Sequence, residues 1–169
     1  MGSVWPTLQD WINALYIIVP IYCTNGAPVL FGGGPSVDFG KTFTDGERIF
    51  GGHKTIRGFV SGLVVGGIVG AFENLYTSSN LFPAALLASL GALLGDLCGA
   101  FIKRRLKISP GGSLPGIDQL DFVIGAVFAV STVFQLSLGT VLILLLVTPP
   151  IHFLANVGAY ALGLKSNYW

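Results

Sequence analysis

The sequence predicts an all-α polytopic membrane protein with five transmembrane helices in a single domain spanning residues 1–169. Hydrophobic residues make up 52% of the chain and charged residues only 10%, whereas soluble domains carry about 25% charged residues. The apolar residues also gather into runs of the length that a membrane-crossing helix needs, about 20 residues. These two observations exclude a water-soluble fold, because so few charges could not cover its surface.

The first two predicted spans flank a long glycine-rich loop. We expect the first helix at about Thr7–Tyr22 and the second at about Arg57–Leu75. The loop between them, residues 23–56, is neither of low complexity nor strongly charged. Loops of this length are usually functional or disordered. The composition favours the functional case, an ordered lid or a ligand-binding loop.

The remaining three spans are separated by shorter connections. After a turn at Tyr76–Leu81, helices are expected at about Phe82–Ile102, Ile117–Leu136 and Leu138–Leu162. A basic loop, Lys103–Gly116, joins the third helix to the fourth. The boundary between the last two spans has few turn signals, so one bent segment is the alternative there.

Glycine and proline mark special positions inside these helices. Glycines recur every four residues in the second and third spans, at Gly62, Gly66, Gly70, Gly91, Gly95 and Gly99. Such stripes favour close packing between membrane helices. In the fifth span, the Pro149-Pro150 pair should kink or break the helix.

The basic residues predict the orientation in the membrane. In the five-helix arrangement all nine fall on one side: Lys41, Arg48, Lys54, Arg57, Lys103, Arg104, Arg105, Lys107 and Lys165. By the positive-inside rule that side is cytoplasmic. We therefore expect a multi-pass cell-membrane protein with its N-terminus outside, its C-terminus in the cytoplasm and its functional site facing the cytoplasm. An even number of spans would put Lys165 on the wrong side.

Three aspartates suggest a metal site. Asp96 lies within an apolar run, where an ionisable residue is costly and is by default a candidate functional residue. Asp118 and Asp121 share one face of the first turn of the next helix. The short loop between these helices sets their ends side by side, so the three carboxylates can converge. Carboxylate oxygens suit Mg²⁺, and we predict all three as its ligands; for Asp118 a helix N-cap is an equal alternative.

Two basic clusters accompany the carboxylates. Lys103 lies two helical turns after Asp96 on the same face, and with Arg104 it is expected to bind phosphate. The neighbouring Arg105 and Lys107 are expected to contact anionic lipid headgroups. The second cluster consists of residues beside a glycine pair whose backbone amides can approach an anion: His53, Lys54 and Arg57.

Other candidate chemistries find little support in the sequence. His152 follows the proline pair and is interpreted as a packing residue. The chain contains no P-loop, no Cys/His cluster and no Ser-His-Asp arrangement, so no covalent nucleophile is predicted.

Several motifs together resemble a known family. GDLCGAFIKRR at 95–105, LPGIDQLDF at 114–122 and earlier segments at 25–28, 34–40, 45–46 and 52–58 are similar to those of the archaeal CDP-archaeol synthases. These enzymes are relatives of the CDP-diacylglycerol synthases. Two positions depart from the wider superfamily pattern: Ala100 stands where it has serine, and Gln119 stands where bacterial members have arginine.

The resemblance implies a Mg²⁺-dependent nucleotidyltransferase of phospholipid biosynthesis. Such an enzyme transfers CMP from CTP to an isoprenoid diether glycerol phosphate, giving a CDP-archaeol-type lipid and pyrophosphate. The implied catalytic residues are Asp96, Asp118, Asp121 and Lys103, and the implied substrate-binding residues are Asn25, Lys54, Arg57, Lys103 and Arg104. Membrane lipids are expected partners and nucleic acid is not. A homodimer is left open.

Two other classes of function stay open on the residues alone. A Mg²⁺-dependent lipid phosphotransferase or phosphatase would use the same carboxylates without releasing pyrophosphate. An ion- or proton-coupled transporter would use Asp96 as its ion site and Pro149-Pro150 as a broken helix. The gathering of ligands at one membrane face and the lack of an inverted repeat count against the transporter.

Overall fold

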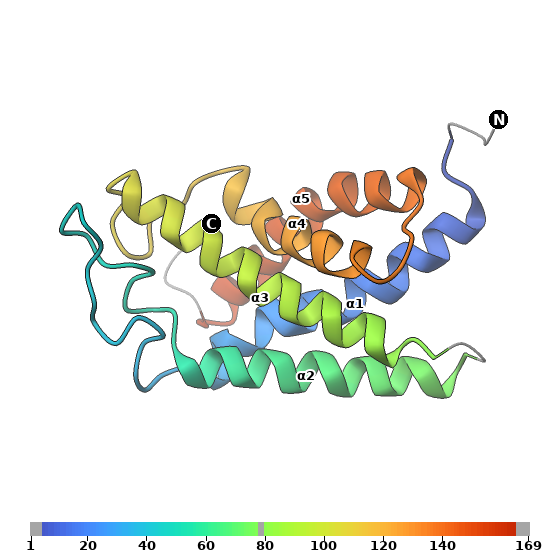
Figure 1. The fold of residues 1–169 in the computed structure, drawn as a ribbon, viewed down its shortest axis with the longest axis horizontal. Coiled ribbons are helices and arrows are strands. Elements are labelled where there is room, and N and C mark those ends of the chain that lie inside the picture. The colour runs from blue at the N-terminus through green and yellow to red at the C-terminus, as the bar shows by residue number, and fades with distance from the viewer. Residues whose placement is uncertain (1–4, 78–79, 165–169) are drawn as a thin grey trace.

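The computed structural model describes residues 5–77 and 80–164, which fold into five helices (Figure 1). The helices are α1 (Leu8–Phe31), α2 (Ile56–Leu75), α3 (Phe82–Arg105), α4 (Ile117–Ser131) and α5 (Leu138–Ala161). This confirms the all-α prediction. Lys165, used to predict the orientation, lies outside the described residues.

Four of the helices, α1, α2, α3 and α5, are long and apolar enough to cross a membrane. The exception is α4, whose 15 residues extend about 22 Å, less than the roughly 30 Å of a bilayer's hydrocarbon core. It ends five residues before the predicted Leu136, and a turn over 132–137 separates it from α5. Five full spans and the placement of the termini stay predictions.

Helix α1 continues well past its predicted end at Tyr22. It starts with a capping box, in which the Thr7 hydroxyl accepts from the Asp10 amide and the Asp10 carboxylate accepts from the Thr7 amide. The segment at 25–28, predicted as loop, is helical despite Pro28. Its packing accounts for the difference, because a Cβ on Gly58 of α2 would lie 3.2 Å from the Pro28 Cβ.

Helix α2 packs through its glycine stripe, as predicted. Its buried residues are all glycines: Gly58, Gly62, Gly66 and Gly70. A Cβ on Gly66 would overlap the side-chain oxygens of Ser89 in α3 and Thr24 in α1. The absence of side chains therefore lets three helices meet. Large apolar residues on the other face of α2 are exposed and suit contact with lipid: Val60, Val64, Ile68 and Phe72.

Helices α3 and α4 form a second close pair. A Cβ on Gly91 would overlap the Gly125 carbonyl oxygen, and one on Gly95 would overlap the Asp121 carbonyl oxygen. The core beside this contact is formed mainly by α1, α3, α4 and α5, and its fully buried large residues include Ile21, Phe122, Val123 and Leu144. Close packing along the α3 stripe brings the start of α4 against the last turns of α3.

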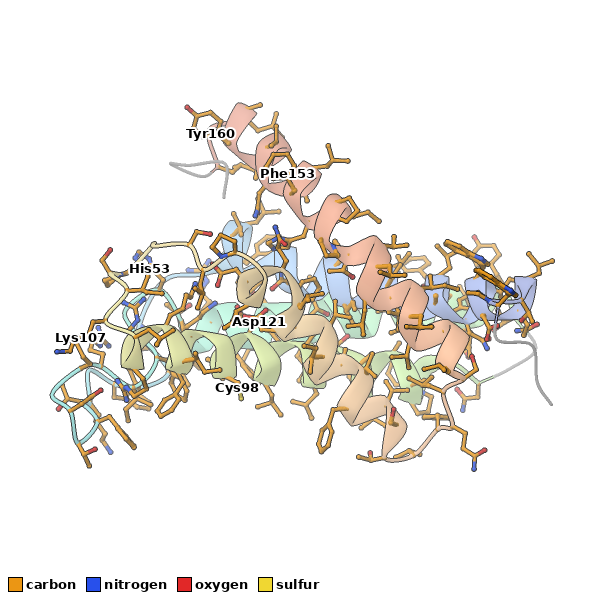
Figure 2. The ribbon with its side chains drawn as sticks, turned by 90° about the horizontal axis from the view of Figure 1, so that it is seen from above. His53, Cys98, Lys107, Asp121, Phe153 and Tyr160 are labelled. Atoms are coloured by element: carbon orange, nitrogen blue, oxygen red, sulfur yellow. The ribbon has the colours of Figure 1, made fainter. Side chains whose placement is uncertain are left out.

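Helix α5 continues through Pro149-Pro150 but changes direction along its length (Figure 1). Of the two predicted outcomes, a kink or a break, the structure therefore shows the kink. Its C-terminal half, which carries Phe153 and Tyr160, projects away from the other helices (Figure 2). Tyr22 of α1 holds the region of the bend, because its hydroxyl donates to the Thr148 carbonyl at 3.0 Å.

The helices alternate in direction, and the two long loops meet at one end of the bundle (Figure 1). Loop 32–55 joins α1 to α2, and loop 106–116 joins α3 to α4. Helix α3 extends three residues beyond the predicted Ile102, so Lys103, Arg104 and Arg105 belong to its last turn. The N-terminal start of α1 and the other two connections lie at the opposite end.

Candidate active site

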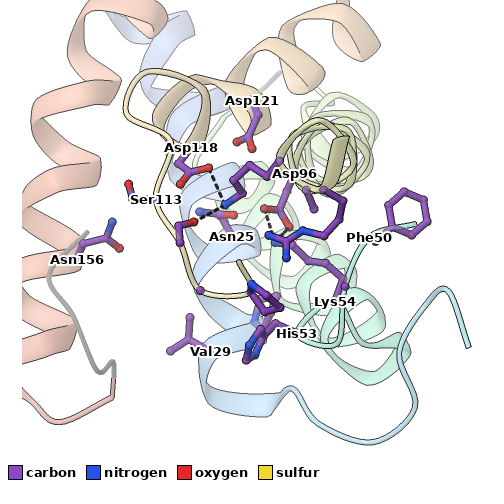
Figure 3. Close-up of a pocket in the computed structure, with 18 of the residues that line it drawn as sticks. Asn25, Val29, Phe50, His53, Lys54, Asp96, Ser113, Asp118, Asp121 and Asn156 are labelled. Atoms are coloured by element: carbon purple, nitrogen blue, oxygen red, sulfur yellow. Dashed lines mark hydrogen bonds and ion pairs between the residues drawn. The ribbon is translucent and has the colours of Figure 1, made fainter. Parts of the chain in front are cut away.

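A cavity of about 490 Å³ opens where the two loops meet the helix ends (Figure 3). Its walls come from α1, α3, α4, α5 and both loops. Seven of the eight residues predicted for the site line this cavity: Asn25, Lys54, Asp96, Lys103, Arg104, Asp118 and Asp121. Segments as far apart in sequence as those of Asn25 and Asn156 thus contribute to one site.

The eighth predicted residue, Arg57, is exposed and is not among the residues that line the cavity. Helix α2 starts after its N-cap Thr55 and turns Gly58 toward Pro28 of α1. Successive helical residues are rotated by about 100°, so Arg57 faces away from that contact. Lys54, in the loop just before the helix, reaches the cavity instead.

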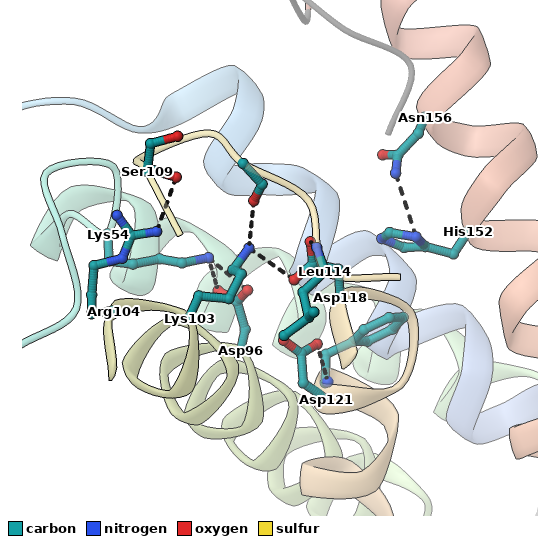
Figure 4. Close-up of polar contacts among 12 residues, drawn as sticks. Lys54, Asp96, Lys103, Arg104, Ser109, Leu114, Asp118, Asp121, His152 and Asn156 are labelled. Carbon is teal, nitrogen blue, oxygen red and sulfur yellow. Dashed lines mark hydrogen bonds and ion pairs between the residues drawn. The ribbon is translucent and has the colours of Figure 1, made fainter. Parts of the chain in front are cut away.

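Two ion pairs cross the cavity wall (Figure 4). Lys54 Nζ lies 2.6 Å from each carboxylate oxygen of Asp96. Lys103 Nζ lies 2.8 Å from Asp118 Oδ1 and donates to the Gly112 carbonyl at 3.4 Å. Although Lys103 and Asp96 share a face of α3, each of them is paired with a residue of another segment.

The carboxylate of Asp121 is held against α3. Its Oδ1 accepts from the Phe122 amide at 2.6 Å, and its Oδ2 occupies the space that a Cβ on Gly99 would fill. Gly99 therefore has a role beyond helix packing, since it makes room for a charged side chain at the cavity.

Asp118 has two partners that place it at the entrance to α4. Its Oδ2 accepts from the Leu114 amide at 2.9 Å, and Oδ1 faces Lys103. The N-cap of α4 is Gly116, so Asp118 is not the N-cap. One of its oxygens joins the end of loop 106–116 to the start of α4. The other contacts Lys103 at the cavity wall.

Arg104 is a buried cation, only 6% exposed. Its Nη2 donates to the Ser109 carbonyl at 3.2 Å. Its Nε has no hydrogen-bond partner among the described residues. A buried N–H group without a partner is costly, and at a cavity wall it is a ready donor for an anionic ligand.

The carboxylates fit a divalent cation by chemistry, since all three line the cavity and supply the oxygen ligands that Mg²⁺ prefers. The structure does not bring these three carboxylates together, although the sequence predicted that they would converge. Among the described residues no group of three His, Cys, Asp or Glu side chains is close enough to hold a metal ion, because Asp96 and Asp118 face lysines. A cation bound here would have to replace those lysines.

The structure adds residues that sequence reasoning missed. His152 and Asn156 of α5 line the cavity, and Asn156 Nδ2 lies 3.4 Å from His152 Nδ1. The His152 ring also packs at 5.7 Å from Phe122, as its predicted packing role requires. Nothing in the sequence indicates that α5 reaches the cavity, because this depends on its path beyond the prolines.

Arg105 also differs from its prediction. It was expected to face lipid headgroups, but its guanidinium carbon lies 4.8 Å from the ring centroid of Phe43 and 4.7 Å from that of Phe101. It ties loop 32–55 to α3 through contacts with Arg48 and Asp45.

A family model described as CarS-like CDP-archaeol synthase matches residues 8–169. The CDP-archaeol synthase of Pyrococcus furiosus is 47% identical over 163 residues, covering 94% of this chain and 98% of that protein. The CDP-archaeol synthase of Methanocaldococcus jannaschii is 38% identical over 169 residues, with 92% and 96% covered.

A solved structure of an intramembrane enzyme for archaeal membrane lipid biosynthesis is similar in fold. It has a TM-score of 0.81 and 32% sequence identity, and the match covers 86% of this chain and 94% of that one. Because the family model and the relatives extend over nearly all of the sequence, they include every segment that lines the cavity. The chain belongs to the CDP-archaeol synthase family.

Proposed function

We propose that the cavity is the site at which this chain transfers CMP from CTP to a phosphorylated isoprenoid diether lipid, with Mg²⁺ as its metal ion. The family membership assigns the cytidylyltransferase activity. The observation that supports this location is the pairing of two lysines with two aspartates, Lys54 with Asp96 and Lys103 with Asp118, around one cavity.

The charges of the cavity balance without a ligand. Three carboxylates, Asp96, Asp118 and Asp121, face three cations, Lys54, Lys103 and Arg104. A triphosphate alone would meet repulsion from the acids, and a metal ion alone would meet repulsion from the bases. The two together are matched, because the acids can hold the metal and the bases can turn to phosphate oxygens.

In the reaction, an oxygen of the lipid phosphate attacks the α-phosphorus of CTP. The bond from that phosphorus to the bridging oxygen breaks, and pyrophosphate leaves with the electron pair. The transfer needs positioning and charge neutralisation more than a covalent partner. Lys54, Lys103 and Arg104 supply cations for the triphosphate and the lipid phosphate, and Asn25 of α1, which also lines the cavity, would help to position the nucleotide.

The metal would supply neutralisation of charge on the triphosphate as the pyrophosphate leaves. The residues that would hold it are Asp96, Asp118 and Asp121. Their lysine partners then become free to bind phosphate. We further propose that the cavity faces the cytoplasm, where CTP is available, because the two loops around it and the helix ends beside them carry eight of the nine Lys and Arg residues.

The test is pyrophosphate release by the purified protein in detergent, with CTP, Mg²⁺ and a phosphorylated diether lipid each omitted in turn. We expect release only when all three are present, with a CDP-lipid product. Release of inorganic phosphate from the lipid, without formation of pyrophosphate, would favour a phosphatase instead. No turnover of CTP by folded protein would contradict the proposal and return Asp96 to consideration as an ion-transport residue.

A further inference from the structure

Loop 32–55 is organised around the buried carboxylate of Asp38, whose side chain has no exposed surface. The carboxylate accepts hydrogen bonds from five groups: Ser36 Oγ at 2.9 Å, the Gly40 amide at 3.0 Å, the Arg48 guanidinium, the Phe50 amide at 3.1 Å and the Gly51 amide at 2.9 Å. Burying a charge is costly unless it is paired and hydrogen-bonded. So many donors around one acid make it the centre of the loop's fold.

The segment that carries Asp38 also holds the backbone of Lys54. The Val37 amide donates to the Lys54 carbonyl at 2.7 Å, and the Ile56 amide donates to the Pro35 carbonyl at 3.0 Å. Asp38 thus holds the chain just before Lys54 through its hydrogen bond with the Gly51 amide. The neighbouring Val37 holds the backbone of Lys54 itself. The Lys54 side chain leaves this support and reaches Asp96 in the cavity (Figure 3).

A second attachment fixes the folded loop to α3. Arg105 Nη2 donates to the Arg48 carbonyl at 2.8 Å, and Arg105 Nε lies 2.9 Å from Asp45 Oδ2. Its guanidinium also stacks against Phe43 of the loop and Phe101 of α3. On the cavity side, Gly51 lies over Arg104, since a Cβ there would be 3.7 Å from Arg104 Cδ. The loop is therefore held on both faces of the end of α3.

We infer that Asp38 and Arg105 are positioning residues of the transferase site, which act through Lys54. Asp38 folds the loop so that Lys54 faces the cavity, and Arg105 fixes the folded loop on α3. Neither is among the residues that line the cavity. This inference rests on the proposed function, because it assumes that Lys54 binds the triphosphate.

The first test compares Asp38→Asn with Glu47→Gln, an equal change of charge at an exposed residue of the same loop. Asparagine has nearly the same shape, but it brings its own N–H donors into a ring of donors. We expect the CTP dissociation constant to rise about tenfold for Asp38→Asn and to stay unchanged for Glu47→Gln. Hydrogen exchange should increase at residues 50–54 and not in the helices.

The second test separates positioning from general stabilisation by repeating Asp38→Asn in a Lys54→Met background. If Asp38 acts through Lys54, the substitution has little further effect on CTP affinity once that lysine is absent. A tenfold loss in both backgrounds would overturn the inference. If the unaltered protein did not bind CTP, the proposed function would fail, while the exchange data would still show whether Asp38 orders residues 50–54.

Arg105→Gln provides an independent variant if Asp38→Asn does not yield folded protein. It removes the attachment to α3 while the Asp38 centre stays intact. We expect the same pattern, a CTP affinity lowered several-fold in the presence of Lys54 and hardly changed with Lys54→Met. Unchanged CTP affinity, in folded protein whose loop shows faster exchange, would contradict the positioning role.

Discussion

The two aspartates of α4 meet the cavity in different ways, and single substitutions test each of them. Asp118 joins loop 106–116 to α4, whereas Asp121 lies over Gly99. We expect Asp118→Asn and Asp121→Asn each to lower turnover at least about 100-fold, measured as pyrophosphate release, while the proteins stay folded in detergent. Gln119→Ala, between them, is the control. Activity retained in either aspartate variant would remove that residue from the site.

Gly99 should matter because of the side chain that it accommodates. A Cβ in Gly99→Ala would overlap Asp121 Oδ2 and displace the carboxylate. Since a misplacement of about 1 Å can cost about 100-fold in rate, we expect a loss of that order in pyrophosphate release. Gly67→Ala is the matched control on α2, because its Cβ would lie 3.7 Å from Leu86 Cδ1, an ordinary van der Waals distance. Equal activity in both variants would contradict this role of Gly99.

The order of loop 32–55 should resist acid. Burial alone would raise the pKa of the Asp38 carboxyl, but the hydrogen bonds from Arg48 and from the amides of Phe50, Gly51 and Gly40 outweigh it and lower the pKa below its usual value. The stability gained from ionised Asp38 is therefore complete above about pH 4, the unfolded value, and is lost only as the pH falls through the lower folded value.

Hydrogen exchange measures this directly. After correction for intrinsic rates, the Gly51 amide should be as protected at pH 5 as at pH 7. Protection that declines between pH 7 and pH 5 would show that the pKa of Asp38 is not lowered.

At the residue scale, the sequence predicted which side chains line the cavity better than it predicted how they pair. Asp96, Asp118 and Asp121 stand out because acids in apolar surroundings are costly. The partner of Asp96 is Lys54, 42 residues earlier, and no helical spacing can predict a contact made by a loop that returns from another helix. Arg57 was included because it is close to Lys54 in sequence, but the start of α2 directs it elsewhere.

Among the elements, α1 and α5 are tied together at the end opposite the cavity. Asp10 Oδ1 accepts from the Ser137 and Thr140 hydroxyls at the start of α5, and Asp10 Oδ2 accepts from Thr7. We expect Asp10→Ala to lower the unfolding temperature in detergent by a few degrees and to leave the KM for CTP unchanged. A raised KM with unaltered unfolding would show that this end communicates with the cavity.

The helix boundaries show where local signals fail. Pro28 in α1 and Pro149-Pro150 in α5 are strong helix-breaking signals, yet both helices continue. In α1 the segment with Pro28 is packed against Gly58, and near the bend of α5 the Thr148 carbonyl accepts from Tyr22. These contacts come from other helices, so only the tertiary structure reveals them.

For the whole molecule, the end that carries the cavity should face the cytoplasm. Thiols introduced by Ser109→Cys in loop 106–116 and by Asn80→Cys between α2 and α3 report the two ends, in a background with Cys23→Ala and Cys98→Ala. In inverted membrane vesicles we expect a membrane-impermeant maleimide to label position 109 and not position 80. The reverse pattern would contradict the proposed orientation. Labelling of both positions in sealed vesicles would contradict their placement on opposite sides of the membrane.

At this scale the sequence predicted the number of helices and the end of the bundle at which the cavity lies. Both follow from hydropathy and from the distribution of the basic residues. It did not predict which helices surround the cavity. The participation of His152 and Asn156 depends on the path of α5, and the length of α4 depends on the turn at 132–137, where neither glycine nor proline occurs.

With the reaction at the proposed site, the positions of the acids along α3 and α4 would determine how far it lies from water. Asp96 precedes the end of α3 at Arg105 by nine residues, about 14 Å along the helix. The phosphates would therefore meet at the bottom of a recess rather than at its rim. The nucleotide's base can stay near the aqueous phase while its phosphates descend, and the lipid tails need never leave the bilayer. Two substrates from immiscible phases would thus react without either one crossing fully into the other's solvent.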